Sequence, residues 1–144
     1  MSRNLPSVLI TGASSGIGAV YADRFAHRGH DLVLVARDKV RMTALAGRLG
    51  ATTGAFVDVL PADLTEPADL RRVEQRLRED DQIGILINNA GAAAPGGVTN
   101  PDLEAFDRLI RLNVTAVTRL AGAAGTRFAS RGKAPSSTFL RSWH

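Results

Sequence analysis

Three glycines in the segment TGASSGIG, which begins at Thr11, have the spacing of a loop that binds phosphate. Gly12 allows the chain to turn sharply, Gly16 allows backbone to approach a pyrophosphate, and Gly18 allows a helix to pack closely. The first turn of that helix would supply free N–H donors and a partial positive charge. We therefore predict a nucleotide-binding loop, on condition that it joins a strand to a helix.

A regular alternation of apolar runs and helical periodicity surrounds this loop. Short continuous apolar runs are typical of strands in a parallel sheet that is covered on both faces, and apolar residues spaced by three and four predict helices. Strands are expected at 7–10, 31–36, 55–60 and 83–87. Helices are expected from Gly16 to about Arg28, from Lys39 to Leu49 with Gly50 as its stop, after Thr65 as a cap, and after the pair Asn100-Pro101.

Three of these helices carry an apolar stripe that should face the sheet. The first stripe is Ile17, Val20, Tyr21 and Phe25, which makes Tyr21 a core residue. The third helix presents Leu70, Val73 and Leu77, and its Glu74/Arg78 pair is expected on a solvated face. The last and longest stripe is Phe106, Leu109, Ile110, Val114, Val117, Leu120, Ala124 and Phe128.

The order βαβαβαβα predicts an α/β fold with a Rossmann-like, doubly wound parallel sheet and helices on both faces. We see no internal boundary, so residues 1–133 are expected to form one domain.

Composition excludes several classes of site. The chain has no cysteine, and its histidines, His27, His30 and His144, have no ligand spacing, so we expect no metal site. The net charge of +4 arises wholly from residues 108–144, which hold seven basic and no acidic side chains. Without a basic stripe interleaved with aromatics we expect no nucleic-acid binding. No signal-peptide core or membrane span is visible, so a cytoplasmic location is expected.

The G-x-x-x-G-x-G spacing at 12–18 resembles the short-chain dehydrogenase/reductase family when it is taken together with three further motifs. These are "DL" at 63–64, "NNAG" at 88–91 and "LNVTAV" at 112–117, all in the order of the family. The resemblance covers roughly residues 5–133 and implies a nicotinamide dinucleotide as cofactor.

The resemblance implies a role for each motif. Asp63 would accept a hydrogen bond from the adenine amino group, beside Leu64, although Asp63 is also suited to a turn before a helix. Gly91 would leave space beside the ribose and nicotinamide, and the asparagines would also shape the strand end. The implied cofactor-binding residues are Thr11, Gly12, Ser14, Ser15, Gly16, Ile17, Gly18, Asp63, Leu64, Asn89, Ala90 and Gly91.

Cofactor preference in the family depends on the end of the second strand. Members that use NAD have a carboxylate there, whereas the aligned residue is Ala36 and Arg37 follows it. An arginine can form a charge-assisted fork with a 2′-phosphate. We therefore expect Arg37 to favour NADP(H) over NAD(H), although Asp38 would oppose this if it faced the ribose.

Asn113 is a polar residue on an apolar stripe and so requires a partner. From the sequence alone it is equally well explained as a buried side chain bonded to backbone. By resemblance it is the asparagine of the catalytic tetrad, which bonds a backbone carbonyl and holds a water in a proton relay.

The remainder of the family's catalytic machinery is missing from the sequence. The family transfers a hydride between the nicotinamide and a carbonyl or alcohol carbon, using a serine and a Tyr-x-x-x-Lys pair. The chain has one tyrosine, Tyr21, and its lysines are Lys39 and Lys133, so no such pair exists. We expect the chain to be inactive as it stands.

Residues 134–144 depart from the expected apolar strand. If one G is restored after the codon of Lys133, suitable codons for this segment read Gly-Ala-Ile-Ile-Asn-Val-Ser-Ser, which is the family's strand with its catalytic serine. We therefore expect an out-of-frame tail, a fold incomplete on its C-terminal side, and an unpaired edge on the fourth strand. The alternatives are a true short homologue with a divergent end, or a non-catalytic nucleotide-binding or interaction module that pairs with a longer homologue.

The family is often homo-oligomeric, and the substrate cannot be read from this sequence.

Overall fold

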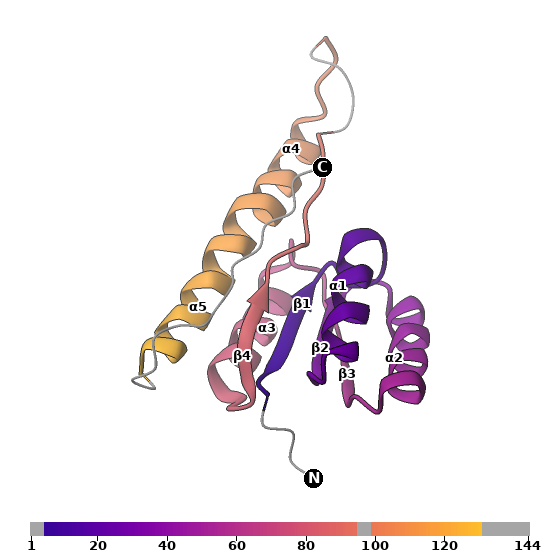
Figure 1. Cartoon of the computed structure of the whole chain (residues 1–144). Coiled ribbons are helices and arrows are strands. Elements are labelled where there is room, and N and C mark those ends of the chain that lie inside the picture. The colour runs from indigo at the N-terminus through magenta and orange to yellow at the C-terminus, as the bar shows by residue number, and fades with distance from the viewer. Residues whose placement is uncertain (1–4, 95–98, 131–144) are drawn as a thin grey trace.

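The computed structural model describes residues 5–94 and 99–130, and its elements follow the predicted alternation (Figure 1). The strands are β1 (Ser7–Thr11), β2 (Leu32–Ala36), β3 (Val57–Pro61) and β4 (Ile83–Ile87). The helices are α1 (Gly16–His27), α2 (Lys39–Thr53), α3 (Pro67–Glu79), α4 (Leu103–Ile110) and α5 (Val117–Ser130), with a π-helical stretch, η1 (Arg111–Ala116), between α4 and α5.

The four strands form one parallel sheet in the order β3-β2-β1-β4. Leu9 of β1 pairs with Val33 of β2 on one side and with Leu86 of β4 on the other. The chain thus moves outward through β2 and β3 and then returns to the opposite side of β1, which is the doubly wound arrangement. The predicted Rossmann-like fold is confirmed, and β4 forms one edge of the described sheet, as expected.

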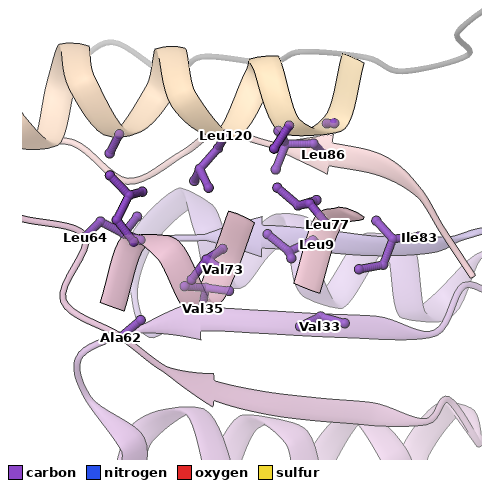
Figure 2. Packing of buried hydrophobic residues seen from close by; sticks show 14 of the residues in the cluster. Leu9, Val33, Val35, Ala62, Leu64, Val73, Leu77, Ile83, Leu86 and Leu120 are labelled. Carbon is purple, nitrogen blue, oxygen red and sulfur yellow. The ribbon is translucent and has the colours of Figure 1, made fainter. Parts of the chain in front are cut away.

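Helices cover both faces of the sheet, with α1 and α2 on one side and α3 and α5 on the other (Figure 1). Because successive side chains of a strand point to opposite faces, Leu9 packs on the α3/α5 side whereas Val8 and Ile10 pack on the α1/α2 side. Figure 2 shows the α3/α5 side, where Leu120 of α5 meets side chains from α3 and the strands. Two separate apolar layers therefore hold the sheet.

Helix α1 packs on its small residues rather than on its predicted stripe. Gly18, Ala22 and Ala26 are buried, whereas Val20 is 51% exposed and Ile17 is also exposed. Small side chains allow the helix to lie close to the sheet, so the large residues are displaced to the flanks. Tyr21 is partly buried against the α1/α2-side core, as expected.

The end of α2 and two helix starts differ from prediction. Helix α2 continues past Gly50 to Thr53 and ends at Gly54, whose φ of 72° is the left-handed conformation that glycine adopts freely. The N-cap of α3 is Glu66, because the hydroxyl of Thr65 bonds to Asp63 instead. The N-cap of α4 is Asp102 rather than Asn100, and its carboxylate accepts a hydrogen bond from the amide of Ala105.

The long C-terminal helix buries a different stripe from the one predicted. Ile110 and Val114 are 51% and 54% exposed, whereas Ala105 and Ala116 are buried. The six-residue π-helical stretch η1 contains more residues per turn than an α-helix, so a 3.6-residue period fails across it. Beyond η1 the period recovers, and Leu120, Ala124 and Phe128 are buried as predicted.

Helix α3 buries Leu70, Val73 and Leu77, as predicted, but Glu74 was wrongly placed in solvent. Glu74 is only 2% exposed, and both of its carboxylate oxygens accept hydrogen bonds from the guanidinium of Arg119 on α5. Hydrogen bonding from Arg119 lowers the pKa of Glu74 below its ordinary value, although burial alone would raise it. An ion pair between the buried Glu74 and the exposed Arg119 therefore joins α3 to α5.

The predicted out-of-frame segment, residues 134–144, lies outside the described residues. Within the described ranges, no helix has the length and apolarity needed to cross a membrane.

Candidate nucleotide-binding site

A cavity of about 990 Å³ opens at the carboxyl ends of the strands, where β1 and β4 lie side by side. The strand order reverses at this point, and doubly wound sheets bind ligands at such positions. The loops after all four strands and one side of α4 contribute to its wall. Of the predicted site residues, the cavity is lined by Gly12, Ser14, Ser15, Gly16, Ile17, Arg37, Asp63, Leu64, Asn89, Ala90 and Gly91.

The start of α1 presents free backbone donors to this cavity. Ser15 is the N-cap residue, but its side chain makes no capping hydrogen bond, and the first turn holds no acidic residue. Gly16 has a φ of 56°, and a Cβ added to it would meet nothing within 4 Å. The open side of Gly16 is therefore the place where a ligand can approach the backbone of the loop.

Gly18 lines no part of the cavity and instead allows α1 to close onto the loop before it. A Cβ at Gly18 would lie 2.1 Å from the carbonyl oxygen of Gly12 and 2.6 Å from Nδ2 of Asn89. The close helix packing expected at Gly18 is thus made against the β1–α1 loop and the segment after β4.

Thr11 is buried beneath the cavity and organises its floor. Its hydroxyl oxygen accepts hydrogen bonds from the amide of Asn89 at 3.1 Å and from the amide of Ala90 at 3.0 Å. Since these amides follow β4, Thr11 joins the ends of β1 and β4. Its contribution to the site is made through the backbone of these neighbours.

The two asparagines after β4 have different partners. Asn88 is buried and donates to the carbonyl of Val117, which connects β4 to the first residue of α5. Asn89 donates from Nδ2 to the carbonyl of Gly12, at 3.2 Å. Its Oδ1 is buried without a hydrogen-bond partner among residues 5–94 and 99–130. Asn89 therefore has a buried acceptor without a partner and also lines the cavity.

Asp63 forms a turn and also faces the cavity. Its Oδ1 accepts hydrogen bonds from the amide and the hydroxyl of Thr65, at 3.0 and 2.7 Å. Burial raises the pKa of the Asp63 carboxyl, but the bonds from Thr65 and the charge of Arg37 outweigh burial, so the net shift is downward. Asp63 is accordingly ionised near neutral pH, and the part of the chain that the structure describes shows no hydrogen bond to its second oxygen.

Arg37 follows β2 at the rim of the cavity and is exposed. No hydrogen bond or ion pair from its guanidinium is seen among the described residues. Asp38, the residue that would oppose phosphate binding, caps α2 through a 3.0 Å hydrogen bond from the amide of Arg41. Asp38 is thus committed to the helix start, and Arg37 is left available.

Asn113 lies in η1, behind the cavity wall. Its Nδ2 donates to the carbonyl of Ala92 at 2.7 Å, and its Oδ1 accepts from the amide of the same residue at 3.0 Å. A Cβ at Gly91 would lie 3.2 Å from this Oδ1. The side chain therefore holds the segment after β4, and a function in proton transfer is a separate prediction.

The α4 side of the cavity and one residue of α2 were not predicted from the sequence. Ala105, Arg108, Leu109 and Leu112 line the wall from α4 and η1, and Arg41 lines it from the first turn of α2. The π-helical stretch changes which residues face the cavity, and no local signal in the sequence marks such a stretch. The described residues bring together no three His, Asp or Glu side chains that could hold a metal.

The chain matches the family model described as short chain dehydrogenase over residues 6–134. An uncharacterized oxidoreductase of Staphylococcus saprophyticus is 35% identical over 107 residues, which are 74% of this chain and 46% of that protein. A short-chain dehydrogenase from Sphingobium yanoikuyae, solved in complex with NADPH, is 65% identical with a TM-score of 0.88. The match covers 90% of this chain and 50% of that one.

A bulky-bulky ketone specific alcohol dehydrogenase from Comamonas testosteroni is 60% identical with a TM-score of 0.89, over 91% of this chain and 52% of that one. The chain thus spans about half the length of the relatives that it matches. The family match over residues 6–134 shows that the chain belongs to the short-chain dehydrogenase family.

Proposed function

We propose that the chain is the NADP(H)-binding part of an oxidoreductase that interconverts a carbonyl compound and an alcohol. The observation that carries this proposal is the single cavity wall formed by the β1–α1 loop, Arg37, Asp63 and the segment after β4. Each of these four parts offers a different chemical group, and together they match the phosphates, ribose and base of a dinucleotide.

The chain's own atoms suit such a ligand. The uncapped start of α1 and the open side of Gly16 offer N–H donors to a pyrophosphate. The unpartnered Oδ1 of Asn89 can accept from a hydroxyl group, and the ionised Asp63 can accept from an amino group. Arg37 can bind a 2′-phosphate through its fork of donors. When bound, the nicotinamide would carry the hydride.

The relatives support the finer part of the proposal. The Sphingobium protein was solved with NADPH, and the Comamonas protein is an alcohol dehydrogenase specific for bulky ketones. We therefore prefer NADP(H) to NAD(H), and a ketone or its alcohol as substrate of the whole enzyme. We propose no turnover by these 144 residues, because the sequence contains no Tyr-x-x-x-Lys pair.

Calorimetric titration of the 144-residue chain with NADPH and with NADH tests the proposal. We expect binding of both, with NADPH tighter, and no oxidation of NADPH by added ketones. Arg37→Ala should lower the NADPH affinity by about 10- to 100-fold, the range for a charge-assisted contact, while leaving NADH nearly unchanged. Arg48→Ala is the control, since Arg48 is exposed on α2 beside Asp23 and outside the cavity. Absence of dinucleotide binding by the folded chain would refute the proposal.

A second candidate function, a module that pairs with a longer homologue, is favoured by one observation. Leu103, Ile110 and Val114 are 70%, 51% and 54% exposed along one continuous helix, which is unusual for aliphatic side chains so close together. Co-expression with a full-length relative, followed by size-exclusion chromatography, tests this function. Ile110→Asp should abolish a mixed complex, whereas NADPH binding by the chain alone should be retained.

A further inference from the structure

Asp63, whose carboxylate faces the cavity wall, is bound by its own chain at nearly every polar atom. Its Oδ1 accepts from the amide and the hydroxyl of Thr65, and its carbonyl accepts from the amide of Glu66 at 3.0 Å. Its own amide donates to Oδ2 of Asp69 at 2.8 Å. Within the described ranges only Oδ2 of Asp63 has no hydrogen bond. One atom is therefore left for a ligand, and the other contacts fix where it lies.

Asp69 makes a contact that its place in α3 does not require. It is the third residue of the helix, where an acidic side chain usually reaches back to the amide of the N-cap residue or interacts with the helix dipole. The N-cap amide, that of Glu66, is already bonded to the carbonyl of Asp63. The Asp69 side chain instead reaches past the N-cap to the amide of Asp63. Asp69 therefore holds the loop before the helix.

Arg72, one helical turn further along α3, fixes Asp69 in turn. Its Nη2 lies 3.2 Å from Oδ1 of Asp69 and donates at 2.7 Å to the carbonyl of Pro61, the last residue of β3. Both carboxylate oxygens of Asp69 are thus used, one on the loop and one on Arg72. The next residue of the loop, Leu64, is buried in the core. The β3–α3 loop is therefore held on both sides of Asp63.

Such support affects recognition because hydrogen bonds weaken steeply as their angle departs from linear. A carboxylate on a loop that can rotate would lose much of its preference for one donor group over another. Asp63 lines the cavity, whereas Asp69 and Arg72 do not. Any effect of these two residues on a ligand must therefore pass through the loop.

We propose that Asp69 is a positioning residue for recognition of the adenine amino group, acting through the backbone of Asp63, and that Arg72 holds Asp69 in place. This inference rests on the proposed function and adds the side chains that fix its base-recognising loop. None of the sequence motifs includes either residue.

The test is the ratio of affinities for NADPH and for its hypoxanthine analogue, measured by calorimetry on the full 144-residue chain and its variants. The analogue has an oxygen in place of the adenine amino group, and its phosphates and riboses are unchanged. The wild-type chain should prefer NADPH by roughly tenfold or more, as for one charge-assisted hydrogen bond.

Asp69→Ala should reduce this preference by about three- to tenfold, because the carboxylate of Asp63 is then misaligned. A loss of helix stability alone would weaken the binding of both ligands equally and leave the ratio unchanged. Asp69→Asn keeps an oxygen that can accept from the amide of Asp63, so it should retain most of the preference.

Glu66→Ala is the matched control. It removes a carboxylate from the same helix start, but this side chain makes no capping hydrogen bond, so the ratio should not change. Asp63→Ala should abolish the preference, and adding Asp69→Ala should lower it no further, because the second residue acts through the first.

Circular dichroism verifies that each variant is folded. If Asp69→Ala does not fold, Arg72→Ala takes its place, since it removes the support and leaves Asp69 intact. Arg72→Ala should reduce the preference by about two- to fivefold, as for a pair that is partly in solvent. An unchanged ratio in this variant would overturn the inference.

The outcomes separate this inference from the proposed function. If Asp63→Ala changes the ratio and Asp69→Ala does not, the inference is overturned and the proposed function stands. If the wild-type chain binds NADPH and the analogue equally, the inference is overturned while dinucleotide binding stands. If the folded wild-type chain binds neither, the proposed function fails and the inference falls with it.

Discussion

The hydroxyl oxygen of Thr11 lies 3.1 Å from the amide nitrogen of Asn89, 78 residues later in the chain. Together with the bond from the amide of Ala90, this contact joins the loop that would bind phosphates to the segment that would lie beside the ribose. Both segments sit at the ends of neighbouring parallel strands, where the ladder of β-sheet hydrogen bonds stops. The threonine side chain extends that ladder by one residue.

Thr11→Val should weaken both the fold and dinucleotide binding. The substitution keeps the shape of the side chain but removes the acceptor of the Ala90 amide and leaves the Asn89 amide with only the carbonyl of Ile87. We expect a loss of about 1–3 kcal/mol of unfolding free energy. Urea denaturation measures this loss. Thr126→Val is the control, because that hydroxyl donates to a carbonyl on the exposed side of α5. Equal stability of the two variants would contradict the function assigned to Thr11.

Gly18→Ala should destabilise the chain, whereas Gly16→Ala should chiefly impair binding. The added methyl at Gly18 would meet the backbone oxygen of Gly12 at 2.1 Å, and relief requires movement of the loop, at a cost of about 1–3 kcal/mol or more. At Gly16 the methyl meets no atom within 4 Å, but the φ of 56° strains an alanine and the methyl would occupy the approach to the cavity.

Thermal denaturation and NADPH titration separate these two effects. Gly122→Ala serves as the control, because this glycine of α5 has open space around it, and alanine there should be neutral or stabilising. A Gly18→Ala variant as stable as the wild type would show that the helix and loop can separate without cost.

The ion pair of Glu74 predicts a defined pH dependence of stability. Because the pKa of Glu74 is lowered in the folded chain, its stabilising contribution is present above the pKa of the unfolded chain and is lost as the pH falls through the folded value. Glu74→Gln should therefore be less stable than the wild type near neutral pH, and the difference should shrink in acid. Urea denaturation at several pH values measures it.

Glu79→Gln, an exposed glutamate on the same helix, is the matched control and should change little at any pH. A difference between Glu74→Gln and the wild type that stays constant from neutral to acid pH would show that the carboxylate charge does not matter.

Our proposal that residues 134–144 are read out of frame predicts a specific result from the coding DNA. One base restored after the codon of Lys133 should open a frame that encodes an apolar strand with a serine, followed by a Tyr-x-x-x-Lys pair. The match to the family model ends at residue 134, next to the proposed position. Sequencing of the genomic DNA through this region is the measurement, and a second frame without those residues would refute the proposal.

The sequence was sufficient for the strands, the doubly wound order and most of the cavity wall. Continuous apolar runs and the glycine loop are local signals, and the pairing of parallel strands follows from them by general rules. Helix faces were harder to predict. In α1 the small residues Gly18, Ala22 and Ala26 are buried against the rest of the fold, in place of larger apolar residues. A pattern of hydrophobicity cannot show this preference for small side chains.

The remaining differences arise from contacts between distant residues. Glu74 was expected in solvent because its partner at the spacing of a helical turn is Arg78, yet its main partner is Arg119, 45 residues away. Arg41 was overlooked because nothing in a helix sequence shows that one side chain reaches a cavity. Asn113 was singled out correctly as a polar residue in need of a partner, and Ala92 is that partner.

The π-helical stretch also sets the relative rotation of the two ends of one long helix. Residues before it line the cavity, and residues after it pack on the sheet and on α3. If all six residues of 111–116 adopted regular α-helix, α5 would turn by about 100° relative to α4, because a π-helical stretch contains about one residue more than an α-helix of the same rotation. Leu120 and Phe128 would then leave the core, or α4 would leave the cavity. A one-residue deletion that removed the π geometry at the same time should leave both surfaces in place.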